Sequence, residues 1–427
     1  MITPSFSPTA TERVLPRLAL DFTTASLDPR VTVTRALNTA TRINSSGYIE
    51  TVNANLPRFD YSPTSIGTCR GLLIEEARTN LVLQSSDYTT ASWTKTDTTV
   101  TAASGTSPDG TNTATLLTQG SAGNAEVWQS FAVGAGNTVT YSKYVKPGNA
   151  QWYMIQIRNG GGTSFAYAFF DLTNGVVGTT SSSGGFATIT GSSITNVGNG
   201  WFRATFTVMI GASFGTAVFS SASVTANSTA TPINNGTRYE WGSQAEVGTF
   251  VTSHIPTTTT SLTRNADAVA MTGSNFTSWF TSGPGTLFTQ GSQPVIFAAS
   301  RPMASLCASA NNPRLTNYRQ SAGNLQGFAI NSAGTANAAG SGVAATANTS
   351  NKIVFAYSAT DTQTISANAS VAGSITGVDM SSSFASFTAL SIGTNFLGDT
   401  SQWCGHVQKV MWWPQKLTDA EVRAFSK

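Results

Sequence analysis

Hydrophobic and polar residues alternate over short stretches along most of the chain. The clearest stretch covers residues 201–210, where the apolar positions share one face: Phe202, Ala204, Phe206, Val208 and Ile210. Trp201 and Arg203 fall on the opposite face. A period of two is typical of a β-strand with one buried face. The same pattern at 137–145, 151–157 and 237–248 predicts a series of short strands without helix-length elements.

The N-terminal part shows the same period over residues 18–22 and 31–35. A turn sequence at 44–47 precedes another short apolar run at 48–52 and predicts a hairpin. Residues 72–80 have Glu early and Arg late, which suits one or two helical turns. An extended arm is the alternative for this segment.

Strand patterns return in the last third of the chain, at 285–289, 294–299, 352–358, 389–392 and 405–413. Trp412 and Trp413 are adjacent, so they should point to opposite faces, with at least one in the core. Thr418 and Glu421 have the spacing of a capping box, which predicts a short C-terminal helix. We therefore expect a mostly β protein of tandem antiparallel β-sandwiches with this single helix.

The length of 427 residues fits two or three domains. The expected modules are an N-terminal attachment module with its linker (1–80), a middle sandwich (81–256) and a C-terminal sandwich (257–427). The polar tract Thr257–Ser261 is interpreted as a linker. Charged residues make up only 10% of the chain, against about 25% in an average globular protein. Ser, Thr, Asn and Gly replace them, as suits exposed strand faces and turns.

Charge and cysteine content exclude several classes of protein. The 23 basic residues are spread along the chain, so no cluster is available to neutralise several phosphates, and we expect no nucleic-acid partner. No apolar run approaches the ~18 residues of a membrane span, and no signal peptide is evident at the start. Cys69, Cys307 and Cys404 are few and far apart, which fits free thiols and no metal site. We expect no cofactor.

No convincing catalytic constellation is present, and we expect no enzymatic activity. The chain has two histidines, His254 and His406, which excludes a zinc site of three histidines. A glycosidase needs two carboxylates roughly 5–10 Å apart. Glu240 and Glu246 have even spacing but lack a third acidic partner, while the adjacent Glu75 and Glu76 would diverge on a strand.

One segment, Gly71–Leu81 (GLLIEEARTNL), together with Pro57–Tyr61 (PRFDY) and Cys69-Arg70, resembles a linker of tailed-bacteriophage virion proteins of the tail-fibre and head-decoration type. The middle region, with SPDGTNTATLL, VGNGWFR and EWGSQAEVGTFVTSHIPT, is similar to jelly-roll carbohydrate-binding modules. The C-terminal region, ending in LTDAEVRAF, is similar to concanavalin-A/laminin-G-like domains. Such domains often hold calcium between Asp and Asn side chains, and no such set is evident here.

These resemblances imply a structural protein of a virion, made in the host bacterial cytoplasm and built into the head or tail with other virion proteins. They also imply a homo-oligomer, with a trimer expected, and weak multivalent adhesion to host-surface glycan. The alternatives are a purely structural decoration protein and a tail-associated polysaccharide hydrolase.

The candidate glycan-binding residues are Trp201 and Arg203, followed by Trp152 and Arg158, on the polar faces of their strands. A Trp ring can stack on the C–H face of a pyranose while Arg binds the hydroxyls. Trp201 could instead cap the edge of the sandwich or lie in a subunit interface.

Overall fold

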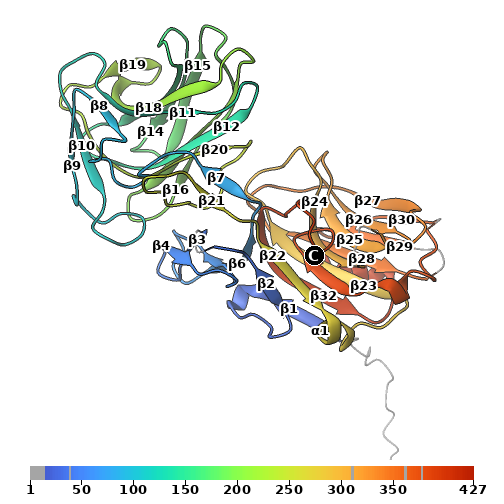
Figure 1. Cartoon of the computed structure of the whole chain (residues 1–427). Helices are drawn as coiled ribbons and strands as arrows, with labels where there is room; N and C mark the ends of the chain where they lie inside the picture. Colours follow the sequence, from blue (N-terminus) through green and yellow to red (C-terminus); the bar gives the residue numbers. More distant parts are fainter. Residues whose placement is uncertain (1–14, 38–39, 309–311, 360–362, 377) are drawn as a thin grey trace, which may run out of the picture. The chain divides into compact units, whose positions relative to one another are not determined.

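The computed structural model of the chain describes residues 15–37, 40–308, 312–359, 363–376 and 378–427. The start of the chain, for which no signal peptide is expected, lies outside these ranges. Short antiparallel strands dominate and a short helix closes the chain, so the predicted fold class is confirmed (Figure 1). A five-residue helix, α1 (Gly273–Thr277), and two 3-10 turns (Phe22–Thr24 and Phe384–Ser386) were not predicted.

Two compact units make up the chain. Of the described residues, those within 15–33, 71–74 and 268–427 form unit 1, and those within 34–70 and 75–267 form unit 2. The first 80 residues, expected to form one module, are divided between both units. The predicted middle module lies within unit 2, and most of the predicted C-terminal module lies within unit 1.

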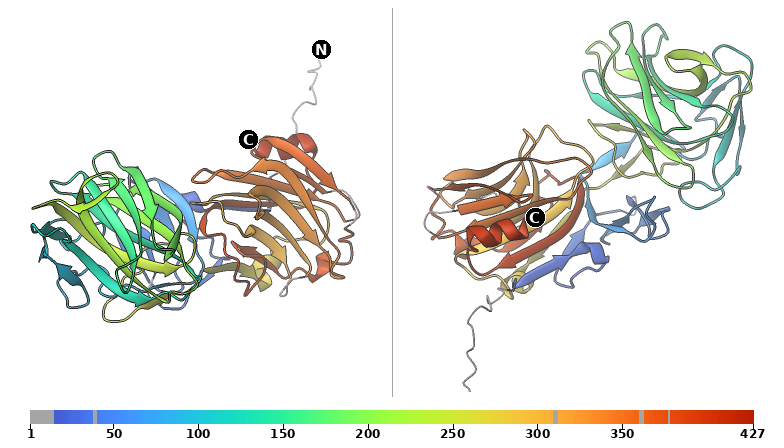
Figure 2. Two further views of the ribbon diagram at one scale, coloured as in Figure 1. Left: turned by 90° about the horizontal axis from the view of Figure 1, so that it is seen from above. Right: turned by 180° about the vertical axis from the view of Figure 1, so that it is seen from behind.

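Unit 2 contains two large antiparallel sheets (Figures 1 and 2). The first has the order β16-β17-β12-β20-β10-β9, and the second has the order β15-β14-β13-β18-β11-β8 with β19 paired to β18. The strands of the first sheet are β9 (Thr98–Thr101), β10 (Thr115–Gln119), β12 (Thr138–Pro147), β16 (Ala187–Asn196), β17 (Phe202–Ile210) and β20 (Thr237–Val247). Those of the second are β8 (Thr94–Thr96), β11 (Glu126–Ala132), β13 (Trp152–Asn159), β14 (Phe165–Asp171), β15 (Val176–Ser182), β18 (Thr216–Ala226) and β19 (Thr229–Pro232).

The core of unit 2 lies between these sheets. Four of the five apolar residues predicted for 202–210 are buried in it and Phe202 packs against it, which confirms the alternation of β17. Tyr141 of β12 and Phe219 of β18 meet across the core with ring centroids 4.8 Å apart. The inner faces of both sheets are therefore fixed by packing.

Among the described residues, five short strands of unit 2 lie outside these two sheets. The hairpin predicted around 44–47 is confirmed, since β3 (Ala40–Ile43) pairs with β4 (Ile49–Val52). Residues 72–80 are extended, so the helical alternative is wrong: β6 (Cys69–Ile74) is followed by β7 (Arg78–Asn80), which pairs with β21 (Leu262–Arg264). The remaining strand is β5 (Phe59–Tyr61). Thr257, the first residue of the expected linker, is buried, and its hydroxyl donates to the carbonyl of Val82. This residue is therefore part of the packed structure of unit 2.

Unit 1 is also built from two antiparallel sheets. In one, the order β30-β29-β28-β23-β32-β6 is joined by β1, which pairs with β32. Its strands are β1 (Leu18–Asp21), β6, β23 (Gly285–Ser292), β28 (Asn351–Tyr357), β29 (Gln363–Ala367), β30 (Ser370–Ile375) and β32 (Gly405–Trp413). The other has the order β2-β22-β31-β24-β25-β26-β27, with strands β2 (Thr32–Thr34), β22 (Ala268–Thr272), β24 (Arg301–Cys307), β25 (Arg314–Arg319), β26 (Asn324–Ile330), β27 (Ala336–Ala344) and β31 (Ala389–Ile392).

The C-terminal helix α2 (Asp419–Phe425) begins with the predicted capping box. The Thr418 hydroxyl accepts from the Glu421 backbone N–H, while the Glu421 carboxylate accepts from the Thr418 N–H at 2.8 Å. The helix packs on β28, β29 and β30 (Figure 2). Trp412 and Trp413 are both buried, and Trp413 lies in the cluster that includes Val422 of the helix.

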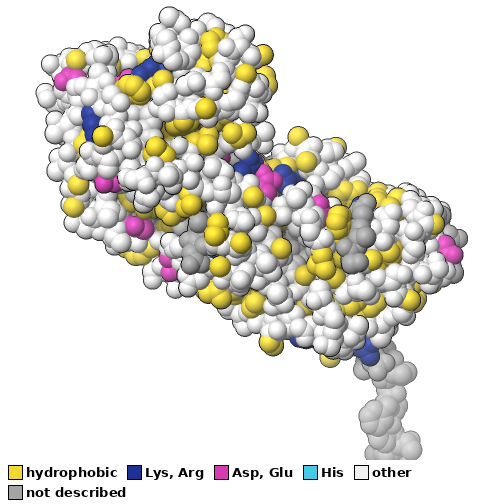
Figure 3. Space-filling view, in the orientation of Figure 1, with side chains coloured by type: hydrophobic (Ala, Val, Ile, Leu, Met, Phe, Trp, Pro, Cys, Tyr) yellow, Lys and Arg dark blue, Asp and Glu magenta, His cyan; other side chains and the backbone are white. Residues whose placement is uncertain are grey.

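The surface is mostly uncharged. On the face shown in Figure 3, basic and acidic side chains are sparse among polar and scattered hydrophobic ones. This agrees with the low charge content of the sequence.

An arginine–carboxylate cluster lies buried in unit 2. Two of its residues come from the segments Pro57–Tyr61 and Gly71–Leu81. Arg58 donates to Glu75 at 2.7 Å and also bonds to Asp267. Arg35 donates to Asp267 at 2.9 Å, and an Arg264 nitrogen lies 3.6 Å from Glu75. All five side chains are at most 8% exposed.

The cluster joins the two ends of the long segment of unit 2. The Glu75 N–H donates to the Asp267 carboxylate at 2.9 Å, and the Asp267 N–H donates to the Glu75 carbonyl at 3.0 Å. Burial alone would raise the pKa of Glu75, but the charges of Arg264 and Arg58 and hydrogen bonds from Ser253 hold that pKa far below its usual range. Glu75 is therefore ionised in the folded protein.

We predict that Glu75→Gln lowers the free energy of unfolding by about 3–5 kcal/mol, because it leaves buried guanidinium charge uncompensated. Glu76→Gln is the matched control. Its ion pair with Arg78 is more exposed, so its loss should cost about 1 kcal/mol or less. Urea unfolding of both variants measures the difference. Equal effects of the two substitutions would contradict a structural role for the cluster.

Candidate functional site

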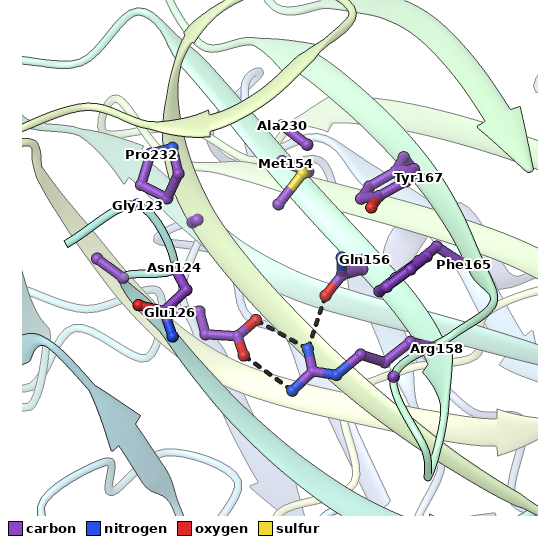
Figure 4. Close-up of a pocket in the computed structure, with 13 residues that line it drawn as sticks. Gly123, Asn124, Glu126, Met154, Gln156, Arg158, Phe165, Tyr167, Ala230 and Pro232 are labelled. Atoms are coloured by element: carbon purple, nitrogen blue, oxygen red, sulfur yellow. Dashed lines mark hydrogen bonds and ion pairs between the residues drawn. The ribbon is translucent and has the colours of Figure 1, made fainter.

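A pocket on the outer face of the second sheet of unit 2, here called the outer-face pocket, is the candidate site (Figure 4). Its volume is about 290 Å³, near the lower end of the ~300–1,000 Å³ usual for ligand pockets. The lining residues come from β11, β13, β14 and β18, with a rim from 123–125, Gly162 and β19: Gly123, Asn124, Ala125, Glu126, Met154, Gln156, Arg158, Gly162, Phe165, Tyr167, Ala222, Ala230 and Pro232.

Strand alternation places these side chains. Along β13, Tyr153, Ile155 and Ile157 lie in the core, so Met154, Gln156 and Arg158 point outward. Antiparallel pairing then sets Gln156 beside Tyr167 and Arg158 beside Phe165 on β14. The pocket floor is therefore a consequence of the register between neighbouring strands.

Aromatic rings form one wall of the pocket. Phe165 and Tyr167 stack with centroids 5.8 Å apart and an interplanar angle of 16°. Tyr167 and Phe169 continue the row at 6.1 Å and 22°. Phe165 and Tyr167 are half-buried while Phe169 is buried, so the first two present ring surface to the pocket. Such rings are suited to contact with apolar C–H groups of a ligand.

Arg158, which lies next to Phe165, reaches Glu126 and forms with it the polar part of the lining (Figure 4). Arg158 Nη1 and Nη2 donate to Glu126 Oε2 and Oε1 at 2.9 and 2.8 Å, which is a bidentate ion pair. Nη1 also donates to the Gln156 oxygen at 2.6 Å. That oxygen accepts from the Ser220 hydroxyl at 3.0 Å as well, which leaves the Gln156 amide nitrogen to donate to a ligand.

A buried polar network supports this sheet from the core side. Lys143 of β12 donates to Glu240 of β20 at 2.6 Å and to Ser221 of β18 at 2.8 Å. Arg238 donates to Glu240 at 2.6 Å, and Tyr153 of β13 reaches the same carboxylate at 3.3 Å. The network therefore links the first sheet to the two strands that carry the pocket floor.

The charges in this network are mutually stabilised. Burial opposes ionisation of Glu240, but Lys143 and Arg238 outweigh it and lower its pKa to about 2. Burial also lowers the pKa of Lys143, to about 8, against the opposing charge of Glu240. Glu240 and Glu246, weighed above as a spaced carboxylate pair, are both fully buried, and Glu246 accepts from the Thr252 N–H at 3.0 Å. Both carboxylates therefore accept hydrogen bonds from buried groups of the protein itself.

The sequence-based placement of Trp201 on an exposed face is wrong. Its side chain is 1% exposed, and its indole N–H donates to the Thr106 carbonyl at 3.0 Å. It packs in a cluster with Ala114, Tyr144 and Trp241 on the side of the first sheet away from the main core. Chain segments from elsewhere in unit 2 cover this face, which strand alternation alone could not reveal.

Arg203 is likewise used internally. Its guanidinium donates to the Thr252 carbonyl at 2.7 Å and to the Ser142 hydroxyl at 3.1 Å. It stacks over Tyr144, 5.1 Å from the ring centroid, rather than on Trp201. Neither Trp201 nor Arg203 lies among the pocket-lining residues.

The second pair of candidates lies on the pocket face. Arg158 lines the pocket, and Trp152 packs beside Met154 on the same side of the sheet while remaining half-buried. Sequence reasoning missed Glu126, Gln156, Phe165 and Tyr167. The apolar–aromatic alternation of β14 was available as a signal, but the pairing of Glu126 with Arg158 across β18 was not.

His254 is buried beside the Trp201 cluster. Its ring lies 4.8 Å from that of Trp241 and 6.1 Å from that of Tyr144. Within the described residues, neither ring nitrogen has a hydrogen-bond partner. Burial, with a smaller contribution from the charge of Arg203, lowers the pKa of His254 from 6.5 to about 3.

This shift predicts acid sensitivity. Between those two pKa values the unfolded chain binds a proton at His254 that the folded chain does not, so stability falls as pH drops below 6.5. From pH 7 to 5 the loss should be about 2 kcal/mol. His254→Leu should remove that part of the pH dependence in urea unfolding experiments. An unchanged difference between the two pH values in the variant would refute this assignment.

Other site types were also sought among the described residues. They contain no group of three or more His, Cys, Asp or Glu placed to hold a metal ion, and no helix that could span a membrane. Cys69, Cys307 and Cys404 are not joined by disulfide bonds.

Residues 276–423 match the family model of the concanavalin A-like lectin/glucanases superfamily, laminin G type. Unit 1 thus contains a concanavalin A-like domain. The match covers less than half of the chain and lies outside the segments that form the outer-face pocket. The chain has no significant match among curated protein sequences.

Several solved carbohydrate-binding and lectin-like structures show a distant likeness. The CBM40 module of a Ruminococcus gnavus IT-sialidase, bound to α2,3-sialyllactose, is 13% identical, with 36% of this chain and 86% of that chain covered and a TM-score of 0.31. Domain 4 of the arabinanase AbnA from Geobacillus stearothermophilus, in complex with arabinotriose, is 10% identical, covering 38% and 73%, with a TM-score of 0.30. A Limulus polyphemus pentraxin is 14% identical, covering 34% and 70%, at 0.28. Scores this low support no conclusion about a ligand.

Proposed function

We propose that this chain is a non-enzymatic structural protein of a tailed-bacteriophage particle that binds host-surface glycan through the outer-face pocket. The observation that carries the binding proposal is the pocket itself, with two accessible stacked rings facing fixed polar groups. The role in a particle rests on the resemblance of the 57–61 and 69–81 segments to virion-protein linkers.

The composition of the pocket supports binding rather than hydrolysis. Glu126 is the one carboxylate among the lining residues, and its two oxygens are held by Arg158. Glycoside hydrolysis generally needs two carboxylates with separate acid and base or nucleophile roles. A lone, ion-paired Glu126 is poorly suited to either role.

The affinity of one pocket should be weak. A small site with one aromatic wall and a few polar groups fits dissociation constants of ~mM to μM, equivalent to about −4 to −8 kcal/mol. Adhesion at that strength becomes effective when many copies are displayed together. We therefore propose display in many copies, attached to other virion proteins of the head or tail. The resemblance to phage fibre and decoration proteins further implies a homotrimer, which we propose as the oligomeric state.

Tyr167→Ala should weaken glycan binding by roughly two- to tenfold, because loss of one stacking contact removes about 0.5–1.5 kcal/mol. The matched control is Tyr61→Ala, which removes a half-buried tyrosine of the same unit outside the pocket. An array of bacterial surface oligosaccharides probed with the full-length protein measures binding, and melting temperatures verify folding.

Two results would oppose the binding proposal. If wild type binds no glycan on the array, the purely structural alternative stands. If incubation with host capsule or lipopolysaccharide releases new reducing ends, the protein is a tail-associated hydrolase.

We expect quantitative mass spectrometry of purified particles to detect the chain in repeated copies, in a number divisible by three. Repeated copies are expected because weak sites require multivalent display, and the multiple of three follows from the proposed trimer. Absence of the chain from particles would overturn the virion role, whereas presence in another multiple would overturn only the trimer.

A further inference from the structure

Glu126 and Arg158 are the charged residues that line the outer-face pocket. The pair is bidentate, and each side chain is 15% exposed. Partial burial reduces screening by solvent and salt, so charges here act more strongly than on the open surface. The charge state of this pair is therefore the main electrostatic property of the site.

The lining residues carry no net charge. Glu126 and Arg158 are the charged members of the set, and they cancel. The guanidinium stacks near Trp128, 5.5 Å from its centroid, which further fixes its position. The arginine is therefore not available as an isolated positive charge.

The two terminal nitrogens of Arg158, which form the end-on fork for a carboxylate, already donate to protein groups. The fork formed by Nη1 and Nη2 holds both oxygens of Glu126, and Nη1 also donates to Gln156 and Ser220. A carboxylate in a ligand would have to displace Glu126 or lie beside its negative charge. Both alternatives cost free energy, since one leaves a carboxylate unpaired and the other places like charges together.

A neutral sugar meets no such conflict. Its hydroxyls can donate to the outward lone pairs of the Glu126 carboxylate and accept from the Gln156 amide nitrogen. Its C–H face can rest on Tyr167 and Phe165, which line the pocket together with the ion pair (Figure 4).

We propose that the Glu126–Arg158 pair makes the pocket selective for neutral hexoses and against uronic and sialic acids. This inference rests on the proposed glycan-binding function. In it Glu126 is the specificity-determining residue, because it neutralises an arginine that would otherwise attract acidic sugars.

The test uses the full chain and pairs of methyl glycosides that differ only at C6. The glucoside, galactoside and mannoside are compared with the corresponding uronides by ligand-observed NMR titration, and lactose is compared with 3′-sialyllactose. Wild type should favour the neutral member of each bound pair by about tenfold or more, the size of effect expected for one unfavourable charge contact.

Glu126→Gln should shift the acidic-to-neutral affinity ratio by at least about tenfold toward the acidic sugars, since it leaves Arg158 uncompensated. The double variant Glu126→Gln with Arg158→Gln should lose that shift. Glu50→Gln is the control, because Glu50 forms an ion pair with Arg42 at 2.7 Å outside the pocket. It should leave the ratio unchanged.

The outcomes separate the two proposals. Tighter binding of uronides or sialyllactose by wild type, or an unchanged ratio in a folded Glu126→Gln variant, overturns the charge selectivity and leaves glycan binding intact. No binding of either class by wild type overturns the proposed function, and the selectivity with it.

Discussion

Unit 2 depends on the closure of the two ends of its long segment. Glu75 and Asp267 are the first and last residues of that segment, and they exchange backbone hydrogen bonds while sharing Arg58 between their carboxylates. Burying two carboxylates and three guanidinium groups costs several kcal/mol of desolvation free energy per ion. This cost would destabilise the folded state unless every group were paired. The pairing therefore requires the N-terminal residues Arg35 and Arg58 to be in place. The segment closed in this way contains both large sheets of unit 2.

The second buried network extends this constraint to the pocket. Lys143, Arg238 and Glu240 lie between the sheets where apolar side chains would otherwise meet. Their hydrogen bonds to Ser221 and Tyr153 fix β18 and β13 relative to the first sheet. On the reverse side of these two strands lie Ala222, Met154, Gln156 and Arg158. A rigid floor of this kind lets a small site keep its polar groups in one arrangement, which reduces the entropy lost when a ligand binds.

The N-terminal motifs PRFDY (57–61) and GLLIEEARTNL (71–81) have a structural role within the fold. Arg58 of PRFDY and Glu75 of GLLIEEARTNL belong to the arginine–carboxylate cluster, and Asp60 accepts from the Ile43 N–H at 2.7 Å. Arg58 and Glu75 are a buried ion pair between residues 17 positions apart, and Asp60 holds the backbone of the β3 strand. They would be needed in any chain that builds this unit, whatever the chain binds or assembles with.

The sequence by itself determined the local elements of this protein. Period-two alternation located β17, the turn residues at 44–47 located the β3–β4 hairpin, and Thr418 with Glu421 located the start of α2. Each follows from contacts between residues close in sequence.

Tertiary structure decided whether side chains on the second face of each strand are buried or exposed. Trp201 and Arg203 are covered by the Thr106 and Thr252 segments, whereas Phe165 and Tyr167, with the same alternation, line a pocket. Glu126 of β11 and Arg158 of β13 are close enough to form an ion pair because a single strand, β18, lies between β11 and β13 in the sheet. Such meetings depend on strand order and coverage, which alternation along a single strand does not encode.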